Sequence, residues 1–264
     1  MCIVALAWQV LDDCPLLLIS NRDEFYQRPA SPLHAWSDVP IYAGQDLQQG
    51  GTWLGMTAQG RWAIVTNHRD ATDKTTYPTS RGDLVKDFLL STQAPIRFAQ
   101  QLEQVQQSYA GFNLFLGDTT QAVYMSNRGE APQVLAKGVY VLSNGILSDD
   151  WHKTAHLRKR FTQELLPLKQ LAQVTQQQCI DVAWDILQDE RKLKPEQLPK
   201  TGLSDDMELL LSSTFIQSPV YGTRCSNYIE IRQDKDKTAW QWLEKTQYGE
   251  QQGCIVTLEK EIIK

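Results

Sequence analysis

The chain has 264 residues, of which 42% are hydrophobic and 22% are charged, and its net charge is −5. This length suits one globular domain with a large core, which we assign to residues 1–264, and the acidic balance excludes the basic face that nucleic-acid binding needs. Basic amphipathic stretches are missing, so no membrane insertion is expected. Five scattered cysteines without metal-ligand spacing are typical of reduced thiols, and they predict a cytoplasmic protein with no bound metal.

Two β-rich runs open the chain, at residues 2–9 and 16–24, and the turn-like segment between them predicts a hairpin. This apolar start is too short to span a bilayer, and it lacks the basic residues of a secretory signal. Residues 28–40 contain prolines and have no clear period, so we expect a loop there. Residues 50–70 then predict a second hairpin that turns at 58–60.

Helical and strand patterns alternate through the rest of the chain. They predict, in order, a helix from Thr79 or Ser80 to about Leu90, a helix over 94–110, strands at 112–118, 122–127 and 139–144, helices from about Asp149 to Gln188, and three strands over 220–259. This order indicates an α+β fold of two antiparallel sheets packed face to face, with helices on their outer faces. A fold with one sheet is the alternative.

Polar residues follow several of the predicted strands. Asn21, Asn67 and Asn144 each come after a strongly apolar run, so the ends of these strands could converge on one rim. Ordinary turn chemistry is the alternative, and we favour it for Asn127 and Asn227.

Asn21 also opens the tetrad Asn-Arg-Asp-Glu. Strand alternation puts Asn21 and Asp23 on one face and Arg22 and Glu24 on the other. We therefore expect Asp23 to face a cleft and Glu24 to face away from it. A plain charged strand end is the alternative for Arg22 and Glu24.

Two residues outside the tetrad carry candidate chemistry. Cys2 can be a small hydrophobe of the first strand, or, once Met1 is removed, a nucleophile that carries its own amine base. Arg224 lies in an apolar run, where an unpaired charge is costly, so we expect it to pair with Asp23 or another carboxylate. A purely structural ion pair is the alternative.

Five segments carry a family resemblance: MCIV…NRDE…RP, GGTWLG, TNHRD, VLSN and YGTR. In this order they resemble the NRDE protein family, also called the transport and Golgi organisation protein 2 family. The resemblance implies an N-terminal nucleophile hydrolase-like fold with four layers, αββα. That superfamily includes cysteine amidases similar to penicillin V acylase and conjugated bile salt hydrolase. The chain departs from those amidases at Ser20, where they have an arginine.

The resemblance also implies catalytic roles for matching residues. Cys2 corresponds to the nucleophile and Asp23 to the aspartate near it. Asn67 and Asn144 resemble the asparagines that stabilise the oxyanion and orient the amine. Arg224 resembles the arginine beside the thiol, which would favour the thiolate.

A small-molecule substrate or ligand is the expected partner, and its binding residues are expected to be Asn21, Arg22, Thr52 and Trp53. Core packing is an equal alternative for Trp53. The first functional hypothesis is an N-terminal cysteine amidohydrolase that cleaves a non-peptide acyl amide without a cofactor. The second is a carrier that binds haem or acyl-CoA in the same cleft, because the family has been linked to haem and lipid handling. The catalytic set favours the first hypothesis, and Ser20 favours the second.

Overall fold

The computed structural model describes residues 2–129, 131–235 and 237–263. One sheet contains β1 (Cys2–Trp8), β2 (Leu16–Phe25), β10 (Gly138–Leu142), β11 (Tyr221–Asp234), β12 (Lys237–Thr246) and β13 (Ile255–Ile262). The other contains β3 (Ala30–Ala35), β4 (Tyr42–Asp46), β5 (Leu54–Met56), β6 (Trp62–Asn67), β7 (Phe112–Gly117), β8 (Ala122–Ser126) and β9 (Gln133–Val134). The α-helices are α1 (Arg81–Leu90), α2 (Pro95–Glu103), α3 (His152–Arg160), α4 (Leu166–Lys169), α5 (Gln176–Leu187) and α6 (Asp205–Leu210), and a π-helical turn (Phe161–Leu165) joins α3 to α4.

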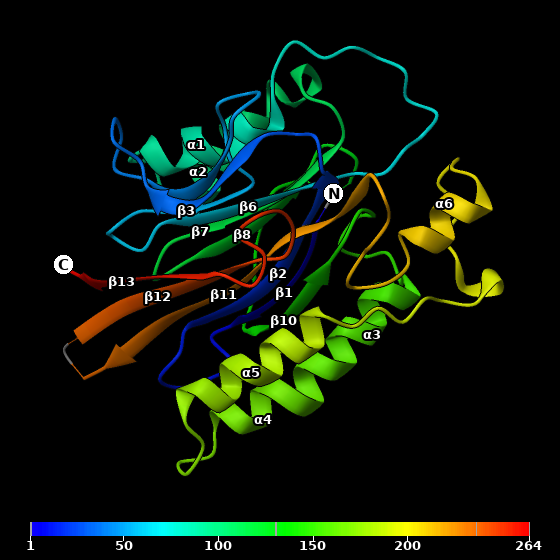
Figure 1. Cartoon of the computed structure of the whole chain (residues 1–264). Coiled ribbons are helices and arrows are strands. Elements are labelled where there is room, and N and C mark those ends of the chain that lie inside the picture. Colours follow the sequence, from blue (N-terminus) through cyan, green and yellow to red (C-terminus); the bar gives the residue numbers. More distant parts are fainter. Residues whose placement is uncertain (1, 130, 236, 264) are drawn as a thin grey trace.

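The two sheets stack face to face between two helical layers (Figure 1). The six-stranded sheet has the order β10-β1-β2-β11-β12-β13, and the seven-stranded sheet runs from β3 to β9 in sequence order. Every strand pair in both sheets is antiparallel. Helices α1 and α2 cover the seven-stranded sheet, and α3, α4 and α5 cover the six-stranded sheet. The predicted αββα sandwich is confirmed.

The sequence patterns missed three strands of the seven-stranded sheet, β3, β4 and β9. Residues 28–40 were expected to form a loop, but β3 lies there and pairs with β4. The register of this pair shifts between Ser31 and His34, on either side of Pro32. Because proline donates no ladder hydrogen bond and the shift interrupts alternation, the segment has no regular period in the sequence.

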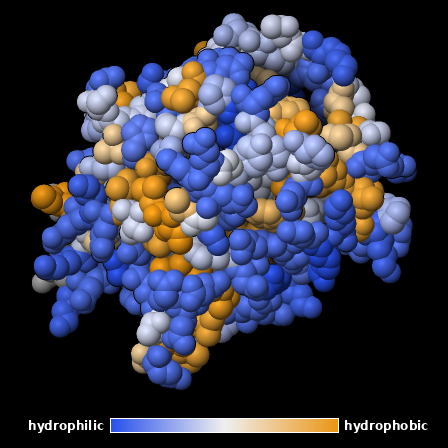
Figure 2. Space-filling view, viewed as in Figure 1, coloured by the Kyte–Doolittle hydropathy of each residue, from blue (hydrophilic) through white to orange (hydrophobic). Residues whose placement is uncertain are grey.

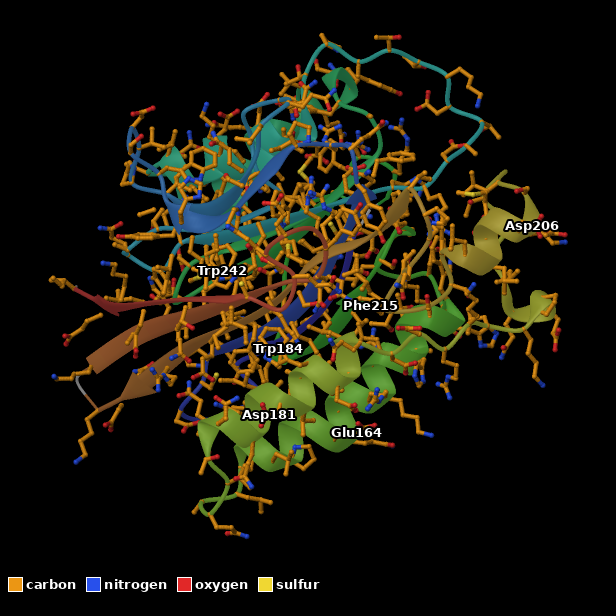
Figure 3. All side chains as sticks on the ribbon, in the orientation of Figure 1. Glu164, Asp181, Trp184, Asp206, Phe215 and Trp242 are labelled. Atoms are coloured by element: carbon orange, nitrogen blue, oxygen red, sulfur yellow. The ribbon has the colours of Figure 1, made fainter. Side chains whose placement is uncertain are left out.

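Strand β1 packs against both neighbouring layers. Its even-numbered residues from Val4 to Trp8 belong to the core between the sheets. Its odd-numbered residues from Ile3 to Ala7 belong to the core under α3 and α5. Figure 3 labels Trp242 of β12, which belongs to the core between the sheets, and Trp184 of α5, which belongs to the core under the helices. Burial on both faces explains why the strand reads as a continuous apolar run, and each large aliphatic side chain buried there contributes about 1.5–3 kcal/mol.

The surface is mainly polar. Figure 2 shows one face of the molecule, on which polar residues predominate and apolar residues form narrow bands between them. Within the described part of the chain, none of the helices has both the length and the apolar character needed to cross a membrane.

Candidate functional site

A cavity of about 420 Å³ opens beside Cys2. We call it the Cys2 cavity. It lies where β1 and α1 begin and where β6 ends, so strand and helix termini form much of its wall. The residues of its lining that matter here are Cys2, Arg22, Asp23, Glu24, Arg28, Asp46, Thr52, Trp53, Asn67 and Arg81.

Cys2 begins β1 and shares the inter-sheet face of that strand with Val4. Only 6% of the residue is exposed. Burial raises the pKa of its thiol, because a thiolate is poorly solvated there, and the nearby Arg22 guanidinium acts in the opposite direction. Met1, whose removal the amidase hypothesis needs, lies outside the described residues.

The tetrad Asn-Arg-Asp-Glu lies on β2 with a different orientation from the one we expected. Cys2 is the direct register partner of Arg22, so these two side chains share one face of the sheet. Asn21 and Asp23 therefore belong to the opposite face, which the helices cover. Arg22 and Glu24, rather than Asp23 alone, line the Cys2 cavity, although Asp23 also contributes to the lining. The alternation within the tetrad was predicted correctly, and Asp23 lines the cavity as expected. Glu24, which we expected to face away, lines it as well, because the register with β1 puts Arg22 and Glu24 on the face of Cys2.

Asn21 has a structural role and does not line the Cys2 cavity. Its Nδ2 donates to the carbonyl oxygens of Leu187 and Thr214, at 2.8 and 3.0 Å. Its Oδ1 accepts a hydrogen bond from Ser226 Oγ at 2.6 Å. The residue is completely buried, and these bonds join β2 to β11, to the end of α5 and to the loop after α6.

Asp23 is also completely buried. Its Oδ1 accepts a hydrogen bond from Thr223 Oγ1 at 2.8 Å, across the pair of strands β2 and β11. Burial raises the pKa of its carboxyl, and the positive charge of Lys153 acts against that rise. Lys153 is buried at the start of α3, donates from Nζ to the Leu211 carbonyl at 3.0 Å, and has a pKa lowered by burial to about 8. Asp23 is thus held in a fixed, poorly hydrated position close to a cation.

Asn67 and Asn144 are brought together, but only Asn67 lines the cavity. Asn144 Nδ2 donates to the main-chain oxygen of Asn67 at 2.8 Å. Asn144 Oδ1 accepts from Arg69 Nη2 at 3.2 Å, and Arg69 Nη1 lies 2.6 Å from Glu208 Oε2 in a buried ion pair. Asn144 therefore holds the end of β6 in place from behind, which makes it a positioning residue for Asn67.

Arg224 lies away from Cys2. Its Nη1 donates to the carbonyl oxygens of Phe25, Tyr26 and Arg28, at 2.9, 3.3 and 2.9 Å. It lines a neighbouring cavity of about 460 Å³, which we call the Glu244 cavity, and not the Cys2 cavity. The expected ion pair with Asp23 is replaced by these bonds, because the β-bulge between Thr223 and Cys225 turns Arg224 toward the loop after β2.

Thr52 and Trp53 both line the Cys2 cavity. Thr52 Oγ1 donates to the Leu54 carbonyl at 2.9 Å, so this hydroxyl shapes the turn before β5. The Trp53 ring packs into the inter-sheet core and also supports the Arg22 guanidinium, whose carbon lies 4.1 Å from the ring centroid. Trp53 thus serves both the core and the cavity wall.

Sequence reasoning missed the buried charges behind the cavity. Lys153, Arg69 and Glu208 are each at most 9% exposed. They come from distant segments, and only Arg69 lies in a motif that we singled out, TNHRD. In the described ranges 2–129, 131–235 and 237–263, no group of three or more His, Cys, Asp or Glu residues is arranged to hold a metal ion.

Comparisons with known proteins identify the family. The family model described as Transport and Golgi organisation 2 matches residues 1–249. The bovine Transport and Golgi organization protein 2 homolog is 31% identical over 240 residues, which cover 83% of each chain. The human homolog is 30% identical over 232 residues, again covering 83% of each chain.

Two solved structures also resemble this one. A Caenorhabditis elegans N-acylethanolamine-hydrolyzing acid amidase ortholog matches 86% of this chain and 91% of its own, with 10% identity and a TM-score of 0.44. A mutant conjugated bile acid hydrolase from Clostridium perfringens matches 97% and 92%, with 11% identity and a TM-score of 0.43. The family model and the mammalian homologs together show that the chain belongs to the Transport and Golgi organisation 2 family.

Proposed function

We propose that the protein is an N-terminal cysteine amidohydrolase that acts on a non-peptide acyl amide. One observation carries the proposal: Cys2, Asp23 and Asn67 line a single cavity, in which each supplies a different part of the required chemistry. Their grouping at strand ends from two different sheets has no evident role in packing alone. Such a cavity, with convergent polar groups and perturbed titration, is the usual form of a catalytic site.

The proposed reaction begins after Met1 has been removed. The free amine of Cys2, with an ordinary pKa near 7.7–8.0, accepts the thiol proton as Sγ attacks the substrate carbonyl carbon. Asn67 donates to the resulting oxyanion. The C–N bond then breaks, the leaving amine takes the proton from the ammonium group, and a thioester remains on Cys2. Water attacks the thioester, which releases the acid and regenerates the thiol.

Neighbouring residues would position these groups. Asp23 follows Arg22, the register partner of Cys2, so its carboxylate is suited to hold an ammonium group at the Cys2 nitrogen. Thr223 fixes the Asp23 carboxyl by a hydrogen bond, and Asn144 fixes the main chain at Asn67. We assign no catalytic role to Arg224, whose hydrogen bonds hold the loop after β2.

The alternative is a carrier that binds haem or acyl-CoA in the same cavity. The observation that favours it is the burial of Cys2, which raises the pKa of the thiol and disfavours the nucleophilic thiolate. A carrier would need neither the thiolate nor a free amine.

The experiment compares a mature chain that begins at Cys2 with a chain in which an inserted residue prevents removal of Met1. Intact-mass measurement establishes each N-terminus, and both chains are assayed for hydrolysis of short N-acyl amides and for binding of haem and acyl-CoA. Positioned acid–base groups contribute about 10²–10⁴ in rate, so we expect hydrolysis by the mature chain only.

Two matched pairs of variants make the result specific. Cys2→Ala should abolish hydrolysis, whereas Cys254→Ala, which changes an exposed cysteine, should retain it. Asp23→Asn should lower the rate more than Glu24→Gln, because Glu24 is already engaged with Arg28. If neither mature nor blocked chain hydrolyses any amide and both bind haem or acyl-CoA equally well, the amidase proposal is wrong and the carrier is correct.

A further inference from the structure

Arg22 carries a buried guanidinium that has no direct polar partner within the described part of the chain. Only 4% of the residue is exposed. Its recorded contact is with the Trp53 ring, and no residue in the ranges 2–129, 131–235 and 237–263 forms a hydrogen bond or an ion pair with its side chain. A buried cation is costly unless an acceptor or counter-charge compensates it. Among the described residues, the Arg22 guanidinium therefore has no acceptor or carboxylate in direct contact, and the charge of Glu244 acts on it only through space.

The stacking geometry leaves the guanidinium able to bind. Contact with the Trp53 ring occupies a face of the planar group and attracts it through the π-system. The N–H donors of a guanidinium point outward in its plane, so stacking does not use them. Arg22 lines both the Cys2 cavity and the Glu244 cavity, and its donors thus border open space on the inter-sheet face that Cys2 also occupies.

Among the described residues, none of the acids near Arg22 forms an ion pair with its side chain. Arg28 lies 2.6 Å from Asp46 and 3.9 Å from Glu24. Glu244, in the neighbouring cavity, accepts a hydrogen bond at Oε1 from the Leu33 main-chain nitrogen at 2.7 Å. Its buried Oε2 has no hydrogen-bond partner among the described residues, and the Arg22 charge acts on Glu244 through space without direct contact.

A second cation of the Cys2 cavity also lacks an acidic partner. Arg81, at the start of α1, donates from Nη1 to the Gly111 carbonyl at 3.1 Å. Within the described residues it forms no ion pair. The Cys2 cavity therefore presents two arginines, Arg22 and Arg81, whose charges no described carboxylate neutralises by direct contact.

We propose that Arg22 is the binding residue for a carboxylate group of the ligand, with Arg81 as a supporting positive charge. A guanidinium binds a planar carboxylate through two parallel hydrogen bonds, and burial strengthens such charge-assisted bonds. If the protein is the amidase proposed above, this carboxylate site identifies its substrate class as an acyl amide that carries a carboxylate. This identification of the substrate rests on the proposed function. The ligand also supplies the counter-charge that Arg22 lacks.

The experiment measures binding, so it does not depend on hydrolysis. Full-length protein with Cys2→Ala is titrated calorimetrically with four probes of similar length: N-octanoylglycine, N-octanoylethanolamine, suberic acid monoethylamide and octyl phosphate. The first carries a carboxylate on the amine side, the second is neutral, the third carries a carboxylate on the acyl side, and the fourth carries a phosphate. Each titration is repeated with three double variants, in which Cys2→Ala is combined with Arg22→Gln, with Arg22→Lys or with Arg28→Gln.

We expect one of the two carboxylate probes to bind at least tenfold more tightly than the neutral probe, and the better one tells which side of the amide meets Arg22. Arg22→Gln should abolish this preference, and Arg22→Lys should keep only part of it, because lysine lacks the two-pronged geometry. Arg28→Gln should preserve it, since Arg28 is already paired with Asp46. Circular dichroism and thermal unfolding establish that each variant is folded.

Equal affinity for neutral and carboxylate probes would overturn the proposal, and so would a preference that survives Arg22→Gln in the folded variant. If octyl phosphate binds more tightly than both carboxylate probes and this affinity depends on Arg22, the site binds a phosphate and the carboxylate assignment is refuted. Failure of the amidase proposal is recognised separately. If the carboxylate preference depends on Arg22 but the mature chain that begins at Cys2 hydrolyses none of the probes, the carboxylate site stands and only the proposed reaction is refuted.

Discussion

Replacing Asn21 with alanine tests whether the first residue of the tetrad is structural. The change removes hydrogen bonds to Leu187, Thr214 and Ser226, all formed by a completely buried side chain. At about 1 kcal/mol for each bond, the free energy of unfolding should fall by roughly 3 kcal/mol. For a chain of this size the melting temperature should fall by about 6–12 °C, at 2–4 °C for each kcal/mol.

The loss is measured by urea unfolding followed by tryptophan fluorescence and far-ultraviolet circular dichroism. Gln173→Ala is the matched control, because it removes an exposed amide, and it should change the free energy by less than about 0.5 kcal/mol. A fall below about 1 kcal/mol for Asn21→Ala would refute the reasoning, since it would mean that the bonds to the neighbouring segments add little to stability.

Two further predictions concern buried ionisable groups. Burial raises the pKa of Glu244 above its ordinary value of 4.5, so the free energy of unfolding should fall as pH rises from there to the raised pKa. Glu244→Gln should flatten this dependence in urea titrations between pH 5 and 8, and an unchanged slope would contradict the cause. Burial lowers the pKa of Lys153 from 10.5 to about 8, so stability should rise between these pH values by up to about 1.4 kcal/mol per unit. Lys153→Met should remove that rise in the same assay, and its persistence would show that other groups produce it.

The positions of the candidate residues show the limits of strand alternation. Alternation alone correctly separated Asn21 and Asp23 from Arg22 and Glu24. It could not tell which pair meets Cys2, because that depends on the register between β1 and β2, and a shift of one residue would exchange the faces. The pairing of Cys2 with Arg22 is therefore a tertiary result.

Arg224 and Asn144 illustrate a second limit. The sequence predicted a carboxylate partner for Arg224, and the structure gives it main-chain carbonyls instead. The resemblance implied a catalytic role for Asn144, whereas its side chain bonds Arg69 and the Asn67 carbonyl behind the cavity. A β-bulge and the packing of distant loops select these partners, and neither leaves a periodic signal in the sequence.

The sequence by itself determined an α+β fold of strands and covering helices, because apolar periodicity reports burial directly and most strands here are buried on at least one face. Periodicity left one sheet or two open; the family resemblance implied two stacked sheets, and the tertiary structure shows them. It also placed Cys2, Asp23 and Asn67 at strand ends, where the fold brings them to one cavity. Only the tertiary structure decided that Asn21 ties layers together, that Lys153 lies near Asp23, and that Arg22 stacks on Trp53 beside Cys2. These features join residues far apart in the chain, and their geometry depends on register and packing, which local sequence does not encode.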